Sequence, residues 1–285
     1  MQVVREPKAF REACEAARAT GARVGLVPTM GALHEGHLSL VDRAAEEGAT
    51  FRAVTIFVNP LQFAAHEDLG RYPRTLEADL EACRARGVDL VFAPDDGAMY
   101  PPGFQTTVTL GELTKPLEGV HRPTHFSGVT TVVTKLFALT GKCLAVFGRK
   151  DYQQWRLLER LALDLDLPVD VVGHRIVREE DGLALSSRNR YLSSDERQRA
   201  LAIARGLRAA NEAWHAGMRD AAALVEIVRG PVETSFDSVD YVAIAKPTTL
   251  ETLEGSVTEA VLLVAAHVGR TRLIDNLELG VDPAP

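Results

Sequence analysis

The stretch VPTMGALHEGHLSLV, residues 27–41, joins the end of a short apolar run to the start of an amphipathic one. It carries two histidines, His34 and His37, spaced three apart around Glu35 and Gly36. The zinc-protease motif needs histidines four apart on a helix, so this spacing excludes it, and no cysteine or carboxylate cluster nearby completes another metal site. Two interpretations stay open: a capped turn with surface histidines, or an anion site where backbone N–H groups, the helix dipole and two imidazoles supply donors.

On either side of this stretch, short apolar runs alternate with helical patterns of ten or more residues. Such alternation is typical of βαβ units that build a parallel sheet, and ligands of these sheets bind beyond the carboxyl ends of the strands. We therefore predict an α/β fold for residues 1–176. The apolar runs are 23–28, 51–58, 88–93 and 143–147, and the helical patterns are 7–19, 36–48, 75–86, 128–140 and 150–165.

The composition changes after about residue 175. A long Ala/Arg/Glu-rich helical region, 194–230, is followed by three β-rich runs at 238–245, 259–268 and 271–278. Strands that follow one another without intervening helices favour an antiparallel sheet. We predict a second, smaller α+β domain over residues 177–285.

The bulk composition excludes several classes of protein. The chain has 285 residues, is 46% hydrophobic and carries a formal net charge of -7. That is enough apolar sequence for one large or two smaller domains, and without a basic block we expect no nucleic-acid partner. No apolar run reaches the length of a membrane span, and we find no secretion signal. Three cysteines without a CxxC pair predict a reduced, cytoplasmic protein.

Three polar positions further along the chain have both a functional and an ordinary interpretation. Gln62 could bind a small polar substrate through its amide, or be a solvated loop residue. Lys150 could meet a phosphate as a point charge, or belong to the polar first turn of a helix. The pair Ser186-Ser187 beside Arg188 is a dense set of phosphate donors, or a polar turn.

The common nucleotide-binding fingerprints are missing. No GxGxxG follows a strand, and Gly141-Lys142 lacks the upstream glycine of a Walker A loop. If a nucleotide binds, a loop without either of these fingerprints holds it.

In the segment HRPTHFSGVTTVV, residues 121–133, Arg122 could hold a carboxylate or phosphate, or be a surface arginine beside a helix cap.

Taken in order along the chain, the polar segments resemble one family. The segments are PTMGALHEGH, FVNPLQF, YPRT, HRPTHFSGV, FGRKDYQQ and LSSRNRYL. Together they resemble the pantoate–β-alanine ligases of the nucleotidylyltransferase superfamily, whose HxGH signature matches residues 34–37. The resemblance extends over residues 2–280.

This resemblance implies a Rossmann-like N-terminal domain with a hinged C-terminal lid, and a homodimer that uses ATP and Mg2+. It also implies a two-step reaction. The pantoate carboxylate attacks the α-phosphorus of ATP and releases pyrophosphate, and the β-alanine amine then attacks the acyl carbon of pantoyl adenylate and releases AMP. We therefore expect ATP-dependent formation of pantothenate.

The resemblance also implies roles for individual residues. His37, with His34, would stabilise charge or supply a proton in adenylation, and Lys150 and Arg188 would complete the catalytic set. Residues expected to contact ATP are Met30, Gly31, Ala32, Leu33, His34, Glu35, Gly36, His37, Gly148, Arg149, Lys150, Asp151, Val177, Leu185, Ser186, Ser187 and Arg188.

The remaining substrates are assigned in the same way. Gln62 and Gln154 would hydrogen-bond pantoate, with Met30 beside its methyl groups, and Gln62 would also border the β-alanine site. Asp79 would bind Mg2+, although Ala78 stands where the family often has a second acidic residue.

Three positions depart from the family's usual residues. Arg149 stands where Glu or Gln is common, Leu185 replaces a frequent Met, and Thr124 replaces a frequent Gly. Two other functions remain as alternatives: a related enzyme that leaves AMP on its product, and an inactive nucleotide-binding protein. The first is disfavoured by FVNPLQF with KDYQQ, which builds a small hydroxy-acid pocket, and the second by the presence of every expected catalytic group. The acidic charge and the missing anticodon-binding domain disfavour a tRNA synthetase.

Overall fold

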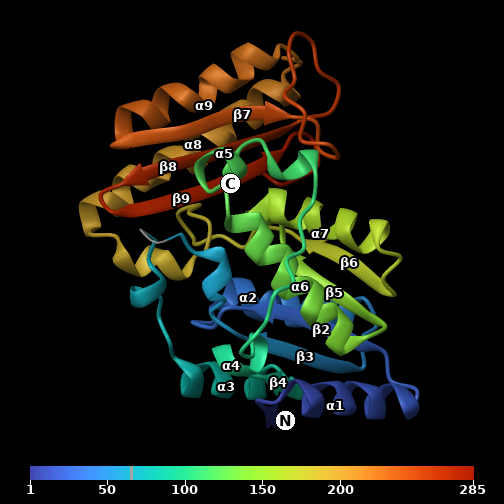
Figure 1. The fold of residues 1–285 in the computed structure, drawn as a ribbon. Helices are drawn as coiled ribbons and strands as arrows, with labels where there is room; N and C mark the ends of the chain where they lie inside the picture. The colour runs from blue at the N-terminus through green and yellow to red at the C-terminus, as the bar shows by residue number, and fades with distance from the viewer. Residues whose placement is uncertain (65–66) are drawn as a thin grey trace. The chain divides into compact units, whose positions relative to one another are not determined.

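The predicted α/β fold is confirmed in a computed structural model, which describes residues 1–64 and 67–285. A six-stranded, all-parallel sheet has the order β1-β4-β3-β2-β5-β6 (Figure 1). Its strands are β1 Gln2–Val4, β2 Val24–Thr29, β3 Phe51–Ile56, β4 Leu90–Phe92, β5 Cys143–Gly148 and β6 Val169–His174.

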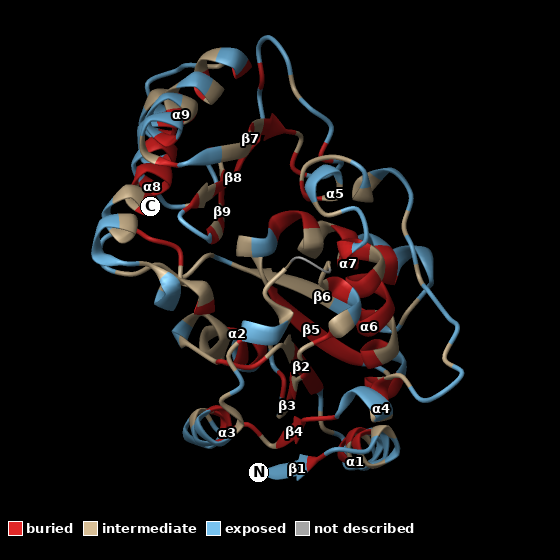
Figure 2. Cartoon of the chain, turned by 60° about the vertical axis from the view of Figure 1, so that its left-hand side comes forward, coloured by how far each residue is buried: buried red, intermediate tan, exposed pale blue. Residues whose placement is uncertain are grey.

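The two outermost strands of this sheet, β1 and β6, were not predicted. β1 has only three residues, and β6 is mostly half-exposed, with a single buried residue in its burial pattern. The four inner strands form the buried band of Figure 2, and their apolar runs follow from burial on both faces. An edge strand needs fewer apolar residues, so its sequence pattern is weaker.

Helices cover both faces of the sheet. Buried side chains of α1, α6 and α7 share one apolar cluster with the strands, and those of α2 and α3 share another on the opposite face. The helices are α1 Pro7–Ala19, α2 Glu35–Glu46, α3 Leu76–Ala85, α4 Asp96–Met99, α5 Glu118–His121, α6 His125–Thr140 and α7 Tyr152–Asp164. Short 3-10 helices are η1 Pro60–Gln62, η2 Leu69–Arg71, η3 Glu112–Thr114, η4 Arg149–Asp151 and η5 Ser187–Tyr191.

The topology determines which loops lie beside each other. β2 pairs with β3 along its whole length, so Thr29 lies opposite Ile56 at their carboxyl ends. The strand order reverses between β2 and β5, which also pair with each other. Loops that leave a parallel sheet at such a reversal form its usual ligand-binding crevice. The loop after β2 is the one that contains His34 and His37.

The C-terminal elements form a separate three-stranded antiparallel sheet, as predicted, in the order β7-β8-β9. Two helices pack against it, and their buried side chains form a core of their own with those of the strands. The elements are α8 Ser194–His215, α9 Ala221–Ser235, β7 Ser238–Ala245, β8 Val261–Val268 and β9 Thr271–Glu278. α8 begins with a capping box, in which Ser193 and Glu196 satisfy each other's backbone N–H groups.

The chain divides into two compact units. The first comprises Met1–Arg149 and Gln153–His174, and the second comprises Lys150–Tyr152 and Arg175–Pro285. The assignment of residues 1–176 and 177–285 to a catalytic domain and a lid stays a prediction. Across residues 1–64 and 67–285, no helix combines the length and apolar character needed to cross a membrane.

Candidate functional site

The loop between β2 and α2, residues 30–37, is here called the histidine loop. His34 is the N-cap of α2, and its Nδ1 accepts a hydrogen bond from the Gly36 backbone N–H at 3.1 Å. His37 Nδ1 accepts in turn from the His34 backbone N–H at 3.4 Å, which completes a capping box built from two imidazoles. The ring centroids are 4.1 Å apart. The capped turn and the histidine pair are therefore one feature.

The capping bonds determine where each ring keeps its proton. A ring nitrogen that accepts an N–H bond carries no proton, so the neutral rings of His34 and His37 are protonated at Nε2. In this tautomer the N–H of each imidazole is at Nε2. Two such donors at a helix N-terminus suit an anionic oxygen, where the helix dipole adds a favourable potential.

The backbone of the histidine loop is held from below by Asp79 of α3. Its Oδ2 accepts from the Ala32 N–H at 3.0 Å, and its Oδ1 accepts from the Leu33 N–H at 2.8 Å. The Gly31 N–H donates to the Thr29 hydroxyl at 3.2 Å. These three amides are engaged within the protein.

Asp79 does not fit the expected role of a magnesium ligand. Both of its carboxylate oxygens already accept hydrogen bonds, including one from Thr75 at 3.2 Å, and the side chain is 3% exposed. Among the residues that the structure describes, no group of three or more His, Cys, Asp or Glu side chains could hold a metal ion. A Mg2+ site made of protein carboxylates has no support at this position.

The loop after β3, residues 57–63, is here called the amide loop, and its centre is Asn59. Asn59 is 1% exposed, and its Nδ2 donates to Gln62 Oε1 at 3.0 Å and to the Gly128 carbonyl at 3.1 Å. Its Oδ1 accepts from the Tyr100 hydroxyl at 2.7 Å and from the Leu61 N–H at 3.3 Å. With both ends of the amide satisfied, Asn59 has a single orientation.

The fixed orientation of the Asn59 amide also fixes the orientation of the Gln62 amide. Because Gln62 Oε1 accepts from Asn59, its Nε2 is the end that contacts the Met30 sulfur, at 3.0 Å. The structure therefore brings together Met30 and Gln62, two residues predicted to contact pantoate. It also gives Gln62 a direction, since the amide N–H groups face the Met30 side.

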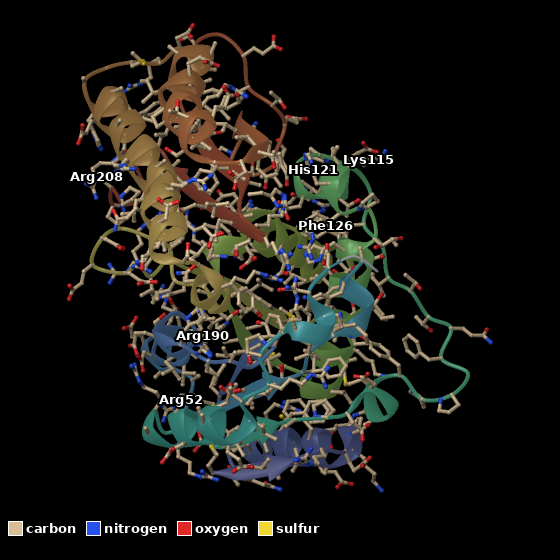
Figure 3. The ribbon with its side chains drawn as sticks, turned by 90° about the vertical axis from the view of Figure 1, so that its left-hand side faces the viewer. Arg52, Lys115, His121, Phe126, Arg190 and Arg208 are labelled. Atoms are coloured by element: carbon tan, nitrogen blue, oxygen red, sulfur yellow. The ribbon has the colours of Figure 1, made fainter. Side chains whose placement is uncertain are left out.

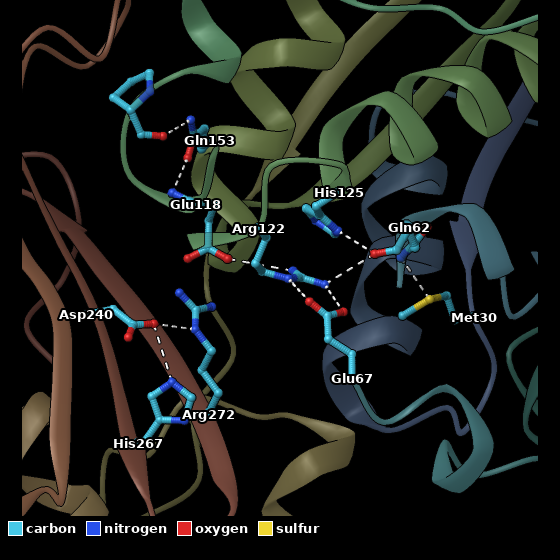
Figure 4. A network of polar contacts seen from close by, with 11 residues as sticks. Met30, Gln62, Glu67, Glu118, Arg122, His125, Gln153, Asp240, His267 and Arg272 are labelled. Atoms are coloured by element: carbon cyan, nitrogen blue, oxygen red, sulfur yellow. Dashed lines mark hydrogen bonds and ion pairs between the residues drawn. The ribbon is translucent and has the colours of Figure 1, made fainter. Parts of the chain in front are cut away.

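The backbone carbonyl of Gln62 is fixed by α6 and the segment before it (Figure 4). His125 Nδ1–H donates to it at 3.0 Å, and Arg122 Nη2 donates at 3.4 Å. Burial, helped by the nearby Arg122 charge, lowers the pKa of His125 to about 4, so the ring is neutral at pH 7. The two residues that Figure 3 labels on either side of this segment differ in burial. His121, the last residue of α5, is exposed, whereas Phe126 of α6 is buried.

Arg122 is held by an acidic partner. Its Nε and Nη2 donate to the two carboxylate oxygens of Glu67 at 2.7 and 2.8 Å. Burial alone would raise the pKa of Glu67, but the hydrogen bonds and charge of Arg122 lower it overall. This bidentate pair anchors the segment before α6.

Three predicted site residues follow one another from the end of β5 into α7: Gly148 ends β5, Arg149 begins η4 and Gln154 lies in α7. The Arg149 guanidinium lies 5.2 Å from the Trp155 ring, in a cation–π contact. The neighbouring Gln153 is buried, donates to the carbonyls of Leu113 and Pro116 at 2.9 Å, and accepts from the Glu118 N–H. The tandem glutamines thus divide, because Gln153 supports α5 while Gln154 is half-buried on α7.

In the second unit, the predicted phosphate donors lie on a tight segment. The Leu185 N–H donates to the Val177 carbonyl at 3.0 Å, and Ser186 Oγ caps η5 by accepting from the Arg188 N–H at 3.3 Å. Asn189 anchors η5 through hydrogen bonds to Glu179 and to the Ala184 carbonyl, at 2.8 and 3.1 Å. Ser187 is buried, and Arg188 is half-buried.

The other residues predicted to contact ATP in this unit are Lys150 and Asp151. Asn276 of β9 donates to the Lys150 backbone carbonyl at 2.9 Å, and Asp151 is exposed. Elsewhere in the unit, Asp240 of β7 accepts from Arg272 at 2.7 Å and lies 3.4 Å from His267 (Figure 4). This polar group was not predicted, because its members are three isolated residues on separate strands.

Sequence reasoning missed the residues that orient the site: Asn59, Tyr100, and Asp79 in its role as a backbone anchor. The motif FVNPLQF contained Asn59, whose position directly after a strand was the available signal. Tyr100 lies outside all the motifs, 41 residues from its partner. Nothing in the local pattern indicated that contact.

These features define a class of protein. A parallel sheet that reverses its order beside β2, and an HxGH pair with two Nε2–H donors at a helix N-terminus, are what a nucleotide-using α/β enzyme needs to act at a phosphate.

Comparison with known proteins identifies the family. The family model of pantoate-beta-alanine ligase matches residues 2–278. A pantothenate synthetase of Anaeromyxobacter dehalogenans is 50% identical over 281 residues, which cover 96% of this chain and 97% of that protein. The chain therefore belongs to the pantoate–β-alanine ligase family, and it is a ligase that joins pantoate to β-alanine.

Solved structures agree. A pantothenate synthetase from Thermus thermophilus has a TM-score of 0.91 and 45% identity, covering 98% of this chain and 99% of its own. A pantoate-beta-alanine ligase from Francisella tularensis, complexed with beta-gamma ATP and β-alanine, has a TM-score of 0.80 and 30% identity, covering 98% and 97%. The resemblance predicted from the sequence motifs is confirmed.

Proposed function

We propose that this chain forms pantothenate through pantoyl adenylate, with ATP as the activating substrate and the histidine loop at the α-phosphate. The observation that carries the proposal is the imidazole capping box, which places and orients the rings of both His34 and His37 at the N-terminus of α2. The complex of the related Francisella ligase with an ATP compound and β-alanine supports the same substrates here.

In the first step, a pantoate carboxylate oxygen bonds to the α-phosphorus and the bond to the pyrophosphate oxygen breaks. Negative charge grows on the phosphate oxygens, and preorganised donors stabilise it at a cost already met by folding. We assign this role to His37, assisted by His34. The capping box fixes the orientation of both rings, and Asp79 holds the backbone of the loop that carries them.

In the second step, the β-alanine amine attacks the acyl carbon, the bond to AMP breaks and the nitrogen loses a proton. Binding the two reactants side by side supplies most of what this step needs, because the mixed anhydride is already activated. We assign the pantoate pocket to Gln62, Gln154 and Met30. The Gln62 amide presents N–H groups, which suit the carboxylate and hydroxyl oxygens of pantoate.

The second unit is proposed to act as a lid that supplies phosphate donors. Lys150, Ser186, Ser187 and Arg188 carry cationic and hydroxyl groups suited to a triphosphate. The backbone at Val177 is assigned to adenine. A lid that excludes water would protect the adenylate from hydrolysis.

The remaining assignments concern the ion, the assembly and the compartment. Because Asp79 does not fit a metal ligand, we propose that Mg2+ is carried by the ATP phosphates together with water ligands, which this ion gives up reluctantly. We propose a homodimer in the cytoplasm. The exposed Leu163 and Leu165 and the open edge of β6 are surfaces that a second copy could cover.

The test is pyrophosphate release from ATP and Mg2+ with the purified protein. We expect release that requires pantoate, and AMP and pantothenate once β-alanine is added. Pantoate-dependent release without β-alanine would establish the adenylate step. Folded protein that releases no pyrophosphate with pantoate would overturn the proposal, and AMP retained on the product would favour the related nucleotidylyl transfer instead.

A further inference from the structure

We propose that Asp79 is a positioning residue, which holds the histidine loop in its active shape through the backbone N–H groups of Ala32 and Leu33. The carboxylate spans two consecutive amides, with bonds of 3.0 and 2.8 Å from its two different oxygens. Thr75, one turn earlier on the chain, donates to Oδ1 at 3.2 Å and fixes the carboxylate itself. This inference rests on the proposed function of the loop at the α-phosphate.

The loop needs such an anchor because its backbone is strained. Gly31 and Ala32 both have left-handed backbone angles, with φ of +83° and +50°. Glycine adopts this region freely, but alanine does so at a cost, because its Cβ crowds the backbone. The Asp79 carboxylate, which accepts from the Ala32 and Leu33 amides, offsets that cost. Without it, Ala32 would relax and His34, two residues later, would move.

The space around the loop shows how closely the parts fit. A Cβ added at Gly31 would lie 3.1 Å from Asp79 Oδ2 and 3.1 Å from Ile56 Cγ2. Asp79 and Ile56, the last residue of β3, therefore both pack closely against the turn at Gly31. A magnesium ion bound there would need the same oxygens that the amides occupy, at bond lengths of about 2.0–2.1 Å.

The experiment compares Asp79→Asn with Glu77→Gln in the full-length protein. Glu77 is exposed on the same helix, so its variant removes the same charge without touching the loop. We expect Asp79→Asn to lower kcat for pantoate-dependent pyrophosphate release by about 10- to 100-fold, the range for lost hydrogen bonds to a charged group. The Mg2+ concentration for half-maximal rate should stay at the wild-type value, and Glu77→Gln should match wild type.

A rescue variant separates positioning from other roles of the carboxylate. Ala32→Gly in the Asp79→Asn background should restore part of kcat, because glycine adopts the left-handed angle without the carboxylate. Amide hydrogen exchange gives a readout without substrates. Exchange at Ala32 and Leu33 should accelerate in Asp79→Asn while the strands of the sheet keep their protection.

Each outcome decides the matter. An Asp79→Asn protein with wild-type kcat and exchange, or one that needs more Mg2+, would overturn the positioning role. If the wild type shows no pantoate-dependent pyrophosphate release, the proposed function fails. The amide hydrogen exchange data alone then test whether Asp79 anchors the loop. If Asp79→Asn does not fold, Thr75→Val takes its place, and unchanged exchange at Ala32 and Leu33 would then reject the anchor.

Discussion

The histidine loop and the amide loop follow adjacent parallel strands, yet they are held in place by opposite chemistry. A buried carboxylate, Asp79, supports the histidine loop through two backbone amides. The amide loop has at its centre a neutral side chain, Asn59, which receives a hydrogen bond from Tyr100 and donates one to Gln62. Both loops begin at the same edge of the sheet, where Thr29 and Ile56 are in register.

This difference matters because the two kinds of anchor control different things. A carboxylate has only acceptors, so it holds any N–H that reaches it and thereby fixes the path of the backbone. A carboxamide has a donor end and an acceptor end, so it also fixes the polarity of its neighbour. One loop thus determines where two imidazoles lie, and the other determines which end of the Gln62 amide faces Met30.

The largest effect is expected from the histidine loop itself. His37→Ala should lower the rate of adenylation by roughly 10²–10³, the scale for loss of one transition-state donor. His37→Asn should be similarly slow, although its side-chain oxygen can still accept from the His34 N–H and preserve the cap. The measurement is pantoate-dependent pyrophosphate release, with the exposed His215→Ala as a control. Near-wild-type rates in both His37 variants would remove this residue from the mechanism.

The next prediction concerns the pH dependence of stability around the amide loop. Burial first, and then the Arg122 charge, lower the pKa of His125 to about 4, below the ordinary value of 6.5. Between these values the unfolded chain binds a proton that the folded chain does not. The free energy of unfolding therefore keeps its full value above pH 6.5. It falls by on the order of 3 kcal/mol as the pH drops to 4.

Urea unfolding at several pH values checks this prediction, with His125→Asn as the matched variant. Asparagine can donate to the Gln62 carbonyl as Nδ1–H does, but it does not titrate. The free energy of unfolding of the variant should change much less than that of wild type between pH 6.5 and 4.5. Below about pH 4.5 the free energy of unfolding of both proteins should fall. Protonation of Glu67, whose pKa is lowered by Arg122, then breaks the ion pair between these two residues. Parallel curves for the two proteins above pH 4.5 would contradict the assignment to His125.

The fold could be predicted from the sequence because its signals are local. Apolar runs and amphipathic periods of a few residues indicated the four inner strands, the main helices and the antiparallel sheet of the second unit. The edge strands β1 and β6 escaped because short or half-exposed strands lack such a pattern. The order of polar motifs then indicated the family, which no single motif did.

The supports of the site could not be predicted in the same way. Asp79 lies 47 residues from Ala32, and His125 lies 63 residues from Gln62. Contacts over such separations depend on how the helices pack on the sheet, which periodicity does not encode. The family resemblance even assigned Asp79 to a metal, because a carboxylate can either bind a cation or accept hydrogen bonds from backbone amides. Only its hydrogen bonds to backbone amides distinguish them.

The polarity of the amide loop leads to a third prediction. Gln62→Glu should raise the KM for pantoate by about 10- to 100-fold, since a donor to a charged carboxylate is replaced by a like charge. The KM for ATP should stay close to wild type. Gln105→Glu adds the same charge at an exposed position and serves as the control. An unchanged pantoate KM would mean that Gln62 does not donate to this substrate.

The smallest effect, and the sharpest test of the contrast, comes from Tyr100. Burial, followed by the nearby Asp96 charge, raises the pKa of Tyr100, so its hydroxyl stays protonated at neutral pH and donates to Asn59 Oδ1 at 2.7 Å. Tyr100→Phe removes this donor and frees the Asn59 amide to turn. We expect kcat/KM for pantoate to fall by about 5- to 10-fold, corresponding to one neutral hydrogen bond of about 1 kcal/mol.

The control for Tyr100 is a double-mutant cycle with Gln62→Ala. If Tyr100 acts only by orienting Gln62 through Asn59, its substitution should have no further effect on pantoate kcat/KM once the Gln62 amide is gone. A loss that persists in the Gln62→Ala background would show that Tyr100 supports the site by packing, through its contacts with Phe57 and Phe104. In that case the amide loop would resemble the histidine loop more closely, with its anchor fixing position and not polarity.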